Sequence, residues 1–307
     1  MKILVTGCHG QVGQALTQHL QDLGEIHAEI HAEIHALGRE QLDLVDPLSI
    51  RQVMQNLRPD MVINAAAYTA VDQAESEEAL AMRINAEAPG ILAEEAKKIG
   101  ASLIHYSTDY VFDGSKQGAW TEDDAVAPLS AYGRSKLAGE QAIAAVGIPH
   151  LILRTSWVYG LHGKNFLLTM LRLAQSRDSF SIVDDQIGAP TWSHTIAEAT
   201  ASIVKQFPRA EQIADHRGIY HLCATGHTSW YGFAQAIFSH PAVQKRPALQ
   251  AITTAQYPTL ARRPANSVMS TEKFQHSFGE LPSWQEALHH CLNSLDRHDN
   301  SARQAVG

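Results

Sequence analysis

The sequence predicts an α/β protein in which a parallel sheet is covered on both faces by helices and is followed by a smaller, mostly helical unit. Short apolar runs alternate with helix-patterned stretches through the first half of the chain. After about residue 156, aromatic residues and prolines become frequent and this alternation ends. Alternating strands and helices are typical of βαβ units, whose right-handed crossovers build a doubly wound sheet.

The apolar runs and the helical periodicity define the expected elements. We expect strands at Ile3–Val5, Met61–Asn64, Ser102–Tyr106 and Leu151–Arg154. We expect helices over Gln11–Leu23, Pro47–Leu57, Ala79–Lys98 and Tyr132–Ala145. The runs are apolar without alternation, which predicts strands buried on both faces. We place a first domain at 1–156, a second at 157–295 and a polar tail at 296–307, with a chain that can cross between the two domains more than once.

Composition excludes several classes of protein. With 307 residues, 45% hydrophobic and 18% charged, the chain is globular rather than disordered. A net charge of −8 argues against nucleic acid or an anionic membrane as the partner. Its three cysteines are widely separated, which indicates a reducing compartment. No signal peptide precedes the first strand and no apolar stretch approaches about 18 residues, so we expect a cytoplasmic protein.

Residues 25–36 read EIHA three times in succession. We expect the last copy, Ile34–Ala36, to be the second strand, because Gly38 and Arg39 must follow at its tip. The earlier copies are expected to form an irregular or extended excursion, which a loop accepts at modest entropic cost. The histidines recur every four residues, but a tandem repeat produces that spacing by itself, and we expect no metal on them.

A glycine-rich turn, Gly7-Cys8-His9-Gly10-Gln11-Val12-Gly13, connects the first strand to the first helix. Glycines permit a tight turn and a close approach of the backbone to a pyrophosphate, which then lies on the amides of the helix start. Alone, such a turn is a weak signal that also occurs in simple strand–helix connections. Its place at the first βα turn favours a dinucleotide site.

Tyr132 and Lys136 are separated by one helical turn, so both side chains lie on one face of the expected helix. A cation beside a phenol stabilises the phenolate and lowers the phenol pKa. The pair could therefore exchange a proton with a carbonyl or alkoxide oxygen. The pattern is common by chance and becomes specific only after the fourth strand of a dinucleotide-type domain.

Two further groups of residues follow strands at the carboxyl edge, where open α/β sheets bind ligands. Ser107–Tyr110 supplies hydroxyls that could bond a substrate carbonyl opposite the tyrosine. The alternative is a turn in which a hydroxyl only bonds the backbone. Asn64–Ala67 ends another strand with small residues. These residues allow a flat cofactor to approach, and they would equally serve strand–helix packing.

Together these features resemble the extended short-chain dehydrogenase/reductase superfamily. Longer strings are similar to the dTDP-4-dehydrorhamnose reductase family: Asn64–Asp72, with Ala74 and Glu75 just after, His105–Gly114, Arg154–Tyr159, Asp185–Thr191 and Ala261–Ser267. The similarity runs from Met1 to about Leu292. The run His105–Gly114 and the Ala-Arg-Arg-Pro segment are much more specific than the glycine turn.

The resemblance implies a Rossmann-type dinucleotide domain followed by a substrate domain. It implies that the nicotinamide nucleotide lies along Gly7, Gly10, Gln11, Val12, Gly13, Ala65, Ala66 and Ala67. It also implies Asp43 and Leu44 beside the adenine and the Tyr106 backbone near the nicotinamide. In this family Tyr132 would donate the proton, and Lys136 would orient the ribose and tune the phenol.

The resemblance also implies a substrate site and a reaction. Thr108 and Asp109 would hold the sugar, and Trp157 would pack over it. Arg262 and Arg263 would meet the diphosphate, with ordinary surface arginines as the alternative. A hydride would pass to the C4 keto group of dTDP-4-dehydro-6-deoxy-L-mannose while Tyr132 protonates the oxygen, giving dTDP-L-rhamnose.

Cofactor preference and assembly can be predicted from positions where this chain differs from NAD-specific sites or from other family members. NAD-specific sites place a carboxylate at the tip of the second strand, whereas this chain has Arg39, so we expect NADPH with NADH tolerated. Some members of the family are dimers bridged by Mg²⁺ on glutamates. The matching positions here are Ala15 and His194, which are poor Mg²⁺ ligands. We therefore expect no structural metal, and a monomer or weak homodimer.

Two alternatives remain open at this point. A nucleotide-sugar epimerase or dehydratase would share the fold, although a dehydratase normally has a glutamate where this chain has Tyr110. A non-catalytic regulatory subunit of the methionine adenosyltransferase type would also share it. The presence of Thr108, Tyr132 and Lys136 together argues against that binding protein.

Overall fold

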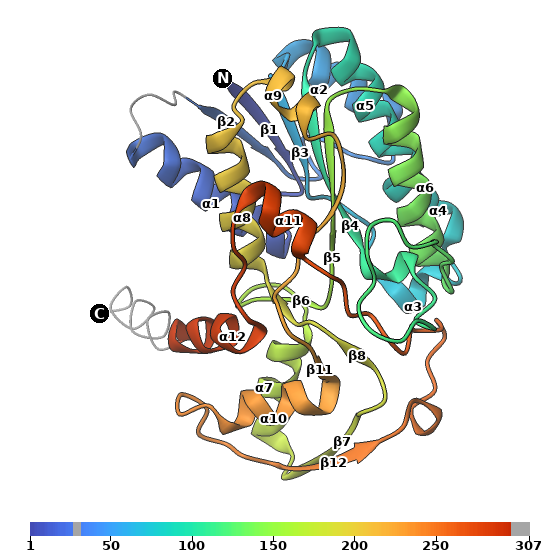
Figure 1. The fold of residues 1–307 in the computed structure, drawn as a ribbon, viewed down its shortest axis with the longest axis vertical. Coiled ribbons are helices and arrows are strands. Elements are labelled where there is room, and N and C mark those ends of the chain that lie inside the picture. Colours follow the sequence, from blue (N-terminus) through green and yellow to red (C-terminus); the bar gives the residue numbers. More distant parts are fainter. Residues whose placement is uncertain (27–31, 296–307) are drawn as a thin grey trace.

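The central feature is a six-stranded, fully parallel sheet with strand order β10-β5-β4-β3-β1-β2 (Figure 1). The structure, a computed structural model, describes residues 1–26 and 32–295. The sheet consists of β1 (Lys2–Thr6), β2 (Glu33–Leu37), β3 (Met61–Asn64), β4 (Ser102–Thr108), β5 (His150–Thr155) and β10 (Gly218–His221). The order reverses around β1, which places a topological switch point, the usual ligand site, at the carboxyl ends of β1 and β3.

Helices cover both faces of this sheet, which confirms the predicted fold class. On one face α1 (Gln11–Ile26) packs against α8 (Ser193–Gln206). On the other face α5 (Ala88–Ile99) lies between α2 (Pro47–Leu57) and α6 (Ala131–Val146). Separate apolar clusters fill the two layers, one beneath α1 and α8 and one beneath α2 and α5. The central strands are buried on both faces because each layer covers one of them.

The single helix expected over Ala79–Lys98 is instead interrupted. It comprises α4 (Glu78–Met82), a π-helical turn, η1 (Arg83–Glu87), and then α5. Pro89 lies in the first turn of α5 and has no N–H to donate to the carbonyl four residues back, that of Asn85. Gly139 of α6 packs against that carbonyl so closely that a Cβ would lie 2.1 Å from the oxygen. The interruption therefore gives α6 its close approach to this layer.

The repeat region agrees with the prediction at its end and differs at its beginning. The last EIHA copy forms β2, which pairs in register with β1 from Lys2↔Glu33 to Thr6↔Leu37. The first helix was expected to end at Leu23 but continues to Ile26. Packing of α1 along α8 offsets the cost of a helical glycine, about 1 kcal/mol. Glu25 and Ile26, expected in the irregular or extended excursion, are therefore helical, and the prediction is wrong for them. Residues 27–31, which hold most of the predicted excursion and two of the three histidines, lie outside the described residues.

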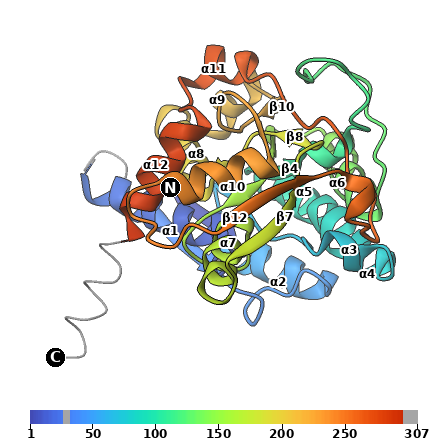
Figure 2. The ribbon, with the colours of Figure 1, turned by 90° about the horizontal axis from the view of Figure 1, so that it is seen from below.

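Much of the chain after residue 156 forms the lower layer in Figure 1. Figure 2 shows this layer from below. Its core lies among α7 (Phe166–Ser176), α10 (Trp230–Ser239) and α12 (Trp284–Asn293). Three small sheets border it, formed by β6 (Val158–Tyr159) with β9 (Thr191–Trp192), β7 (Ser179–Val183) with β12 (Ala248–Ile252), and β8 (Ile187–Gly188) with β11 (Thr228–Ser229). The remaining short helices are α3 (Val71–Ala74), η2 (Asp109–Val111), α9 (Ala210–Asp215), η3 (Thr254–Gln256) and α11 (Glu272–Phe278).

The chain returns to the central sheet after entering this layer. β10 pairs with β5, and α8 covers the sheet beside α1. The helices α9 and α11 also pack on this first layer, and the division at residue 156 remains a prediction. Within the described part of the chain, no helix combines the length and apolar character needed to span a membrane.

Candidate active site

The glycine turn is closed by its own backbone at the carboxyl end of β1. Gly7 has φ +69°, and its carbonyl accepts a hydrogen bond from the Gly10 N–H at 2.9 Å. A Cβ on Gly13 would lie 2.1 Å from that same carbonyl oxygen, so only glycine fits. The turn directs the first amides of α1 toward the switch point, an arrangement that suits a pyrophosphate.

The neighbouring segments expected to bind the nucleotide lie close to this turn. A Cβ on Gly7 would lie 2.8 Å from the Ala66 backbone, which brings the Ala65–Ala67 segment against the turn. At the end of β2, a Cβ on Gly38 would lie 2.6 Å from the His9 ring. The structure therefore brings together three segments that are separate in sequence.

The expected adenosine residues follow β2. Arg39 lies 3.8 Å from Asp43, and its side chain is 78% exposed, so the guanidinium is accessible to a ligand. Leu44 is buried, and the Asp43 carboxylate also accepts a hydrogen bond from the Val45 N–H. The exposed Arg39 guanidinium and the buried Leu44 side chain are thus the polar and apolar groups at this end of β2.

Tyr132 lies in the first turn of α6, which Ser130 caps through the Gly133 N–H. Its phenol lies close to the Thr108 hydroxyl, and its ring meets Tyr110 edge-on at 5.7 Å. Burial raises the pKa of Tyr132 to about 12, an effect that the Thr108 hydroxyl partly opposes. The prediction that Lys136 lowers this pKa is therefore wrong for the protein by itself.

The side chain of Lys136 explains the difference. Its Nζ donates to the Tyr106 carbonyl at 2.6 Å and lies 3.3 Å from His105 Nε2. The ammonium group is thus held at β4, although Lys136 and Tyr132 share a helix face as expected. Burial lowers the pKa of Lys136 to about 8, and the Glu140 carboxylate one turn further along α6 opposes that shift.

Thr108 and Asp109 lie where β4 enters η2. The Thr108 hydroxyl accepts from the Tyr110 N–H at 3.2 Å and donates to Asp109 Oδ1 at 3.0 Å. The hydroxyl therefore caps the turn, as the second alternative expects, and its bond to a substrate carbonyl stays a prediction. The other carboxylate oxygen of Asp109 is buried without a hydrogen-bond partner among the described residues. Burial raises the pKa of Asp109 to about 6, against the effect of Ser267.

Trp157 has a left-handed backbone with φ +46°. Its indole stacks on that of Trp230, with ring centroids 3.6 Å apart and planes 4° from parallel. A Cβ on Gly188 would lie 2.5 Å from the Trp157 ring, so β8 supports its edge. Trp230 in turn donates to Gln186 at 3.2 Å. Sequence reasoning missed Trp230, because nothing near it in the sequence marks its partner 73 residues away.

The two arginines differ in their surroundings. Arg263 forms an ion pair with Asp72 at 2.8 Å and also hydrogen-bonds Tyr110, which places it beside the tyrosine pair. Arg262 is exposed and has no ion pair among the described residues. Sequence reasoning quoted Asp72 only as part of a family string and did not identify it as the partner of Arg263.

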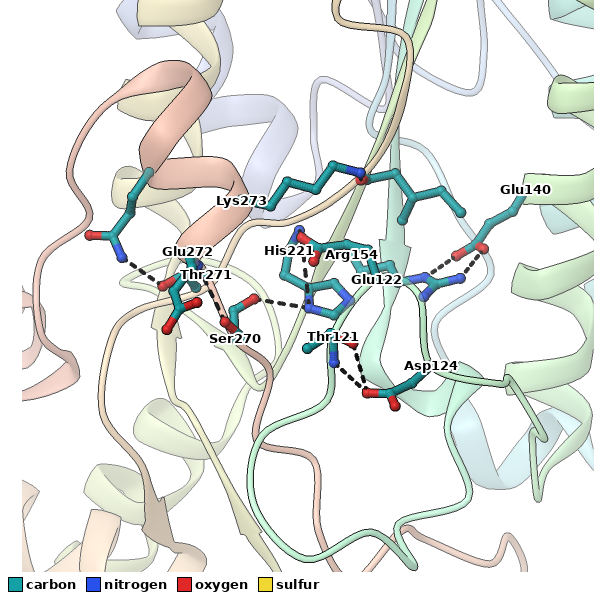
Figure 3. A network of polar contacts seen from close by, with 12 residues as sticks. Thr121, Glu122, Asp124, Glu140, Arg154, His221, Ser270, Thr271, Glu272 and Lys273 are labelled. Carbon is teal, nitrogen blue, oxygen red and sulfur yellow. Dashed lines mark hydrogen bonds and ion pairs between the residues drawn. The ribbon is translucent and has the colours of Figure 1, made fainter.

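A polar network surrounds Arg154 of β5 and His221 of β10 (Figure 3). Arg154 of β5 donates to Glu140 through two nitrogens, at 2.9 and 2.7 Å, and both side chains are 2% exposed. Ser107 donates to the same carboxylate. On the other side of β5, His221 bonds the Ser270 carbonyl, and its backbone N–H donates to Glu122. Glu140 follows Lys136 by four residues, so helical spacing was the signal that could have identified it.

No three His, Cys, Asp or Glu side chains of the described residues gather where they could hold a metal ion. His194 stacks on Trp192 and meets His19 of α1 edge-on at 4.1 Å. The position that the family uses for a bridging glutamate is thus part of an aromatic contact.

Comparison with known proteins agrees with this geometry. The RmlD substrate binding domain family matches residues 1–297. A dTDP-4-dehydrorhamnose reductase of Burkholderia thailandensis is 46% identical over 96% of this chain and 99% of its own length. Crystal structures of such reductases from Clostridium acetobutylicum and Bacillus anthracis, the latter in complex with NADP, are each 34% identical. Their TM-scores are 0.88 and 0.86, over 96% and 95% of this chain and 100% and 99% of theirs. The chain belongs to the dTDP-4-dehydrorhamnose reductase family.

Proposed function

We propose that this protein reduces the C4 keto group of dTDP-4-dehydro-6-deoxy-L-mannose with NADPH and forms dTDP-L-rhamnose. The observation that carries the proposal is the position of the Tyr132 phenol beside the Thr108 hydroxyl at the carboxyl edge of the sheet. A proton donor and a second hydroxyl meet there beside the switch point, where a carbonyl oxygen would accept from both. The similarity to reductases over almost the whole chain supports the same activity.

The residues present fit a nicotinamide dinucleotide. A Cβ on Gly7 would meet the Ala66 backbone and one on Gly13 would meet the Gly7 carbonyl, so the turn is as tight as a close approach of pyrophosphate requires. When bound, the reduced cofactor supplies the hydride. Tyr106 and Lys136 would flank its nicotinamide ribose, and Gln11 is held at the helix start by Asn165 at 2.8 Å.

The chemistry of this chain lies in its proton donor. With a pKa of about 12, Tyr132 stays protonated at neutral pH and is a competent acid. It donates to the C4 oxygen as negative charge develops there, and Thr108 holds that oxygen in line. Lys136 supplies the positive charge that makes proton loss from the phenol easier once the site is complete.

Other residues than the proton donor and lysine would recognise the sugar and the diphosphate. The unpartnered oxygen of Asp109 is suited to accept a sugar hydroxyl, since a buried polar atom without a partner costs about 1–3 kcal/mol. Trp157 offers a flat apolar surface for the sugar ring. Arg262 and Arg263 provide guanidinium groups for the diphosphate, with Arg263 sharing its charge with Asp72.

Arg39 supports the preference for NADPH. It stands at the tip of β2, where an NAD site has a carboxylate, and is exposed enough to meet a 2′-phosphate. The ratio of kcat/KM for NADPH to that for NADH should exceed one. Arg39→Ala should lower this ratio mainly through KM for NADPH, and an NADH-preferring wild type would contradict the assignment.

The decisive experiment is an assay with dTDP-4-dehydro-6-deoxy-L-mannose and NADPH, followed by identification of the sugar product. Cofactor oxidation with formation of the 4-hydroxy sugar supports the proposal. Conversion of a nucleotide sugar without net cofactor oxidation would indicate an epimerase or dehydratase. Absence of turnover, together with activation of a methionine adenosyltransferase, would indicate a regulatory subunit.

We also propose a cytoplasmic monomer or weak homodimer without a structural metal. Ala15 and His194 provide no carboxylate for Mg²⁺, and His194 is engaged with Trp192 and His19. Light scattering with and without Mg²⁺ should give the same mass, and a Mg²⁺-dependent dimer would overturn this proposal.

A further inference from the structure

A chain of buried hydrogen bonds leads from β1 across the sheet to Lys136. Thr6 Oγ1 lies 2.6 Å from Asn64 Oδ1, and Asn64 Nδ2 lies 3.0 Å from His105 Nδ1. His105 Nε2 is then 3.3 Å from Lys136 Nζ. All four side chains are at most 2% exposed, so water cannot supply missing partners. The proposed function uses Lys136 but assigns nothing to Thr6, Asn64 or His105.

The direction of each hydrogen bond follows from the backbone. The Ala66 N–H donates to Thr6 Oγ1 at 3.2 Å, so this oxygen is already an acceptor and its own proton is available for Asn64 Oδ1. The Asn64 amide is thereby oriented with Nδ2 toward His105, to which it donates. His105 Nδ1 is therefore an acceptor and carries no proton.

His105 is uncharged, because burial holds its pKa well below the usual value. The single proton of the neutral ring must then lie on Nε2, the nitrogen that faces Lys136. An uncharged lysine amine can accept from this N–H and donate to the Tyr106 carbonyl. A charged ammonium has only donors and would meet another donor at this position.

We propose that His105 is a positioning residue for Lys136: the chain from Thr6 through Asn64 directs the His105 Nε2–H at the lysine nitrogen and so favours its uncharged form. This inference rests on the proposed function, in which Lys136 assists the proton donor. The Lys136 ammonium therefore loses a proton more readily: it can pass one to the phenolate that Tyr132 leaves after donating its own, and it becomes the uncharged amine that the His105 N–H stabilises.

Other groups around Lys136 act in the opposite direction or are neutral. The Glu140 carboxylate on α6 favours the ammonium, and Arg154 of β5 neutralises much of that charge by its bidentate pair. The Tyr106 carbonyl of β4 accepts from either form. Tyr132, one turn earlier on α6, is a neutral phenol at neutral pH. The His105 contact is the one in the described site that distinguishes the two forms by donor and acceptor.

The first test measures the histidine directly. In ¹⁵N-histidine-labelled full-length protein, NMR distinguishes protonated from unprotonated ring nitrogens, and the His105 signals are those missing from His105→Asn. We expect a proton on Nε2 and none on Nδ1 near neutral pH. A proton on Nδ1 would overturn the proposal. This readout does not depend on turnover, so it remains valid even if the protein does not reduce the proposed sugar.

The second test releases the chain at its far end. Thr6→Val keeps the side-chain shape but removes the donor that orients Asn64, so the amide can turn and His105 Nε2 can become an acceptor for the ammonium. The proton should move to Nδ1. The alkaline limb of kcat/KM should shift upward by about 0.5–1 pH unit, the equivalent of one hydrogen bond.

Thr6→Ser is the matched control, because it retains the hydroxyl and should keep the wild-type tautomer and pH profile. A folded, active Thr6→Val protein with an unchanged alkaline limb would show that the chain does not control Lys136. If Thr6→Val does not fold, Asn64→Asp applies the same test, since a carboxylate must accept from His105 Nδ1–H and should shift the tautomer identically. Retention of the Nε2 proton in that variant would likewise overturn the proposal.

Discussion

The two sides of the site are constructed differently. On the sheet side, Lys136 is held by a hydrogen bond to β4, Tyr132 lies beside Thr108, and the surrounding polar groups are almost completely buried. On the side of the later layer, Trp157 is held by stacking on Trp230, and Arg263 by an ion pair that is partly exposed. Directional bonds fix atom positions closely, whereas stacking and exposed ion pairs allow adjustment. The comparison indicates a rigid chemical side and an adaptable recognition side.

Two ion pairs show the same contrast in energetic terms. Both pairs are bidentate, but Glu140 and Arg154 are each 2% exposed, whereas Asp72 and Arg263 are 42% and 21% exposed. Removing one partner of a buried pair leaves an uncompensated charge, while an exposed pair contributes little. The sheet side should therefore be much more sensitive to substitution.

The largest effect is expected at the proton donor. Tyr132→Phe should lower kcat by about 10²–10⁴-fold, the usual contribution of a general acid, while NADPH still binds. Tyr110→Phe is the matched control, because that ring contacts Tyr132 but has no assigned proton transfer. Steady-state kinetics and cofactor titration measure both variants. Wild-type turnover in Tyr132→Phe would remove the basis of the proposed mechanism.

The two ion pairs provide the next test, measured as the free energy of unfolding in urea. Glu140→Gln should destabilise the protein by about 3–5 kcal/mol, because Arg154 remains charged and buried. Asp72→Asn should cost only about 0–1 kcal/mol. Equal losses in the two variants would contradict the difference inferred between the two sides.

The aromatic stack should affect substrate affinity more modestly. Trp230→Ala removes the surface against which Trp157 is held and should raise KM for the sugar nucleotide about 2- to 10-fold, the equivalent of one aromatic pair. Trp230→Phe should preserve most of the affinity. A fall in kcat without a change in KM would instead place Trp230 on the chemical side.

The last effect depends on pH and concerns His221. Burial, with Arg154 nearby, lowers the pKa of His221 to about 3. Below about pH 6.5 the unfolded chain binds a proton that the folded protein excludes until about pH 3. Stability from this group is therefore present above pH 6.5 and is lost as the pH falls, by at most about 1.4 kcal/mol per unit.

His221→Asn should flatten the dependence of the unfolding free energy on pH between 6.5 and 4 relative to the wild type. Chemical denaturation at several pH values measures both proteins. Parallel curves would show that His221 has the same pKa in the folded and unfolded states, which would contradict the lowered pKa.

Several features of this protein follow from the sequence by itself. The glycine turn, the strands before and after it, and the shared face of Tyr132 and Lys136 all occur where the residues predict. These are local properties, since they depend on glycine backbone freedom, on apolar runs and on the helical repeat. The resemblance to the family extended the expected cofactor site to Ala65–Ala67. The structure shows that the Gly7 and Ala66 backbones are in close contact.

Other features were decided only by the tertiary structure. Helical spacing placed Lys136 beside Tyr132, but the Tyr106 carbonyl holds its ammonium at β4. The stack of Trp157 on Trp230 and the pairing of β10 with β5 join residues far apart in the chain. Such contacts depend on rotamers and on the packing of whole layers, whose energies are sums over distant residues. Local pattern can therefore name the reacting groups, whereas their hydrogen-bond partners, and with them their pKa values, are determined by the packed fold.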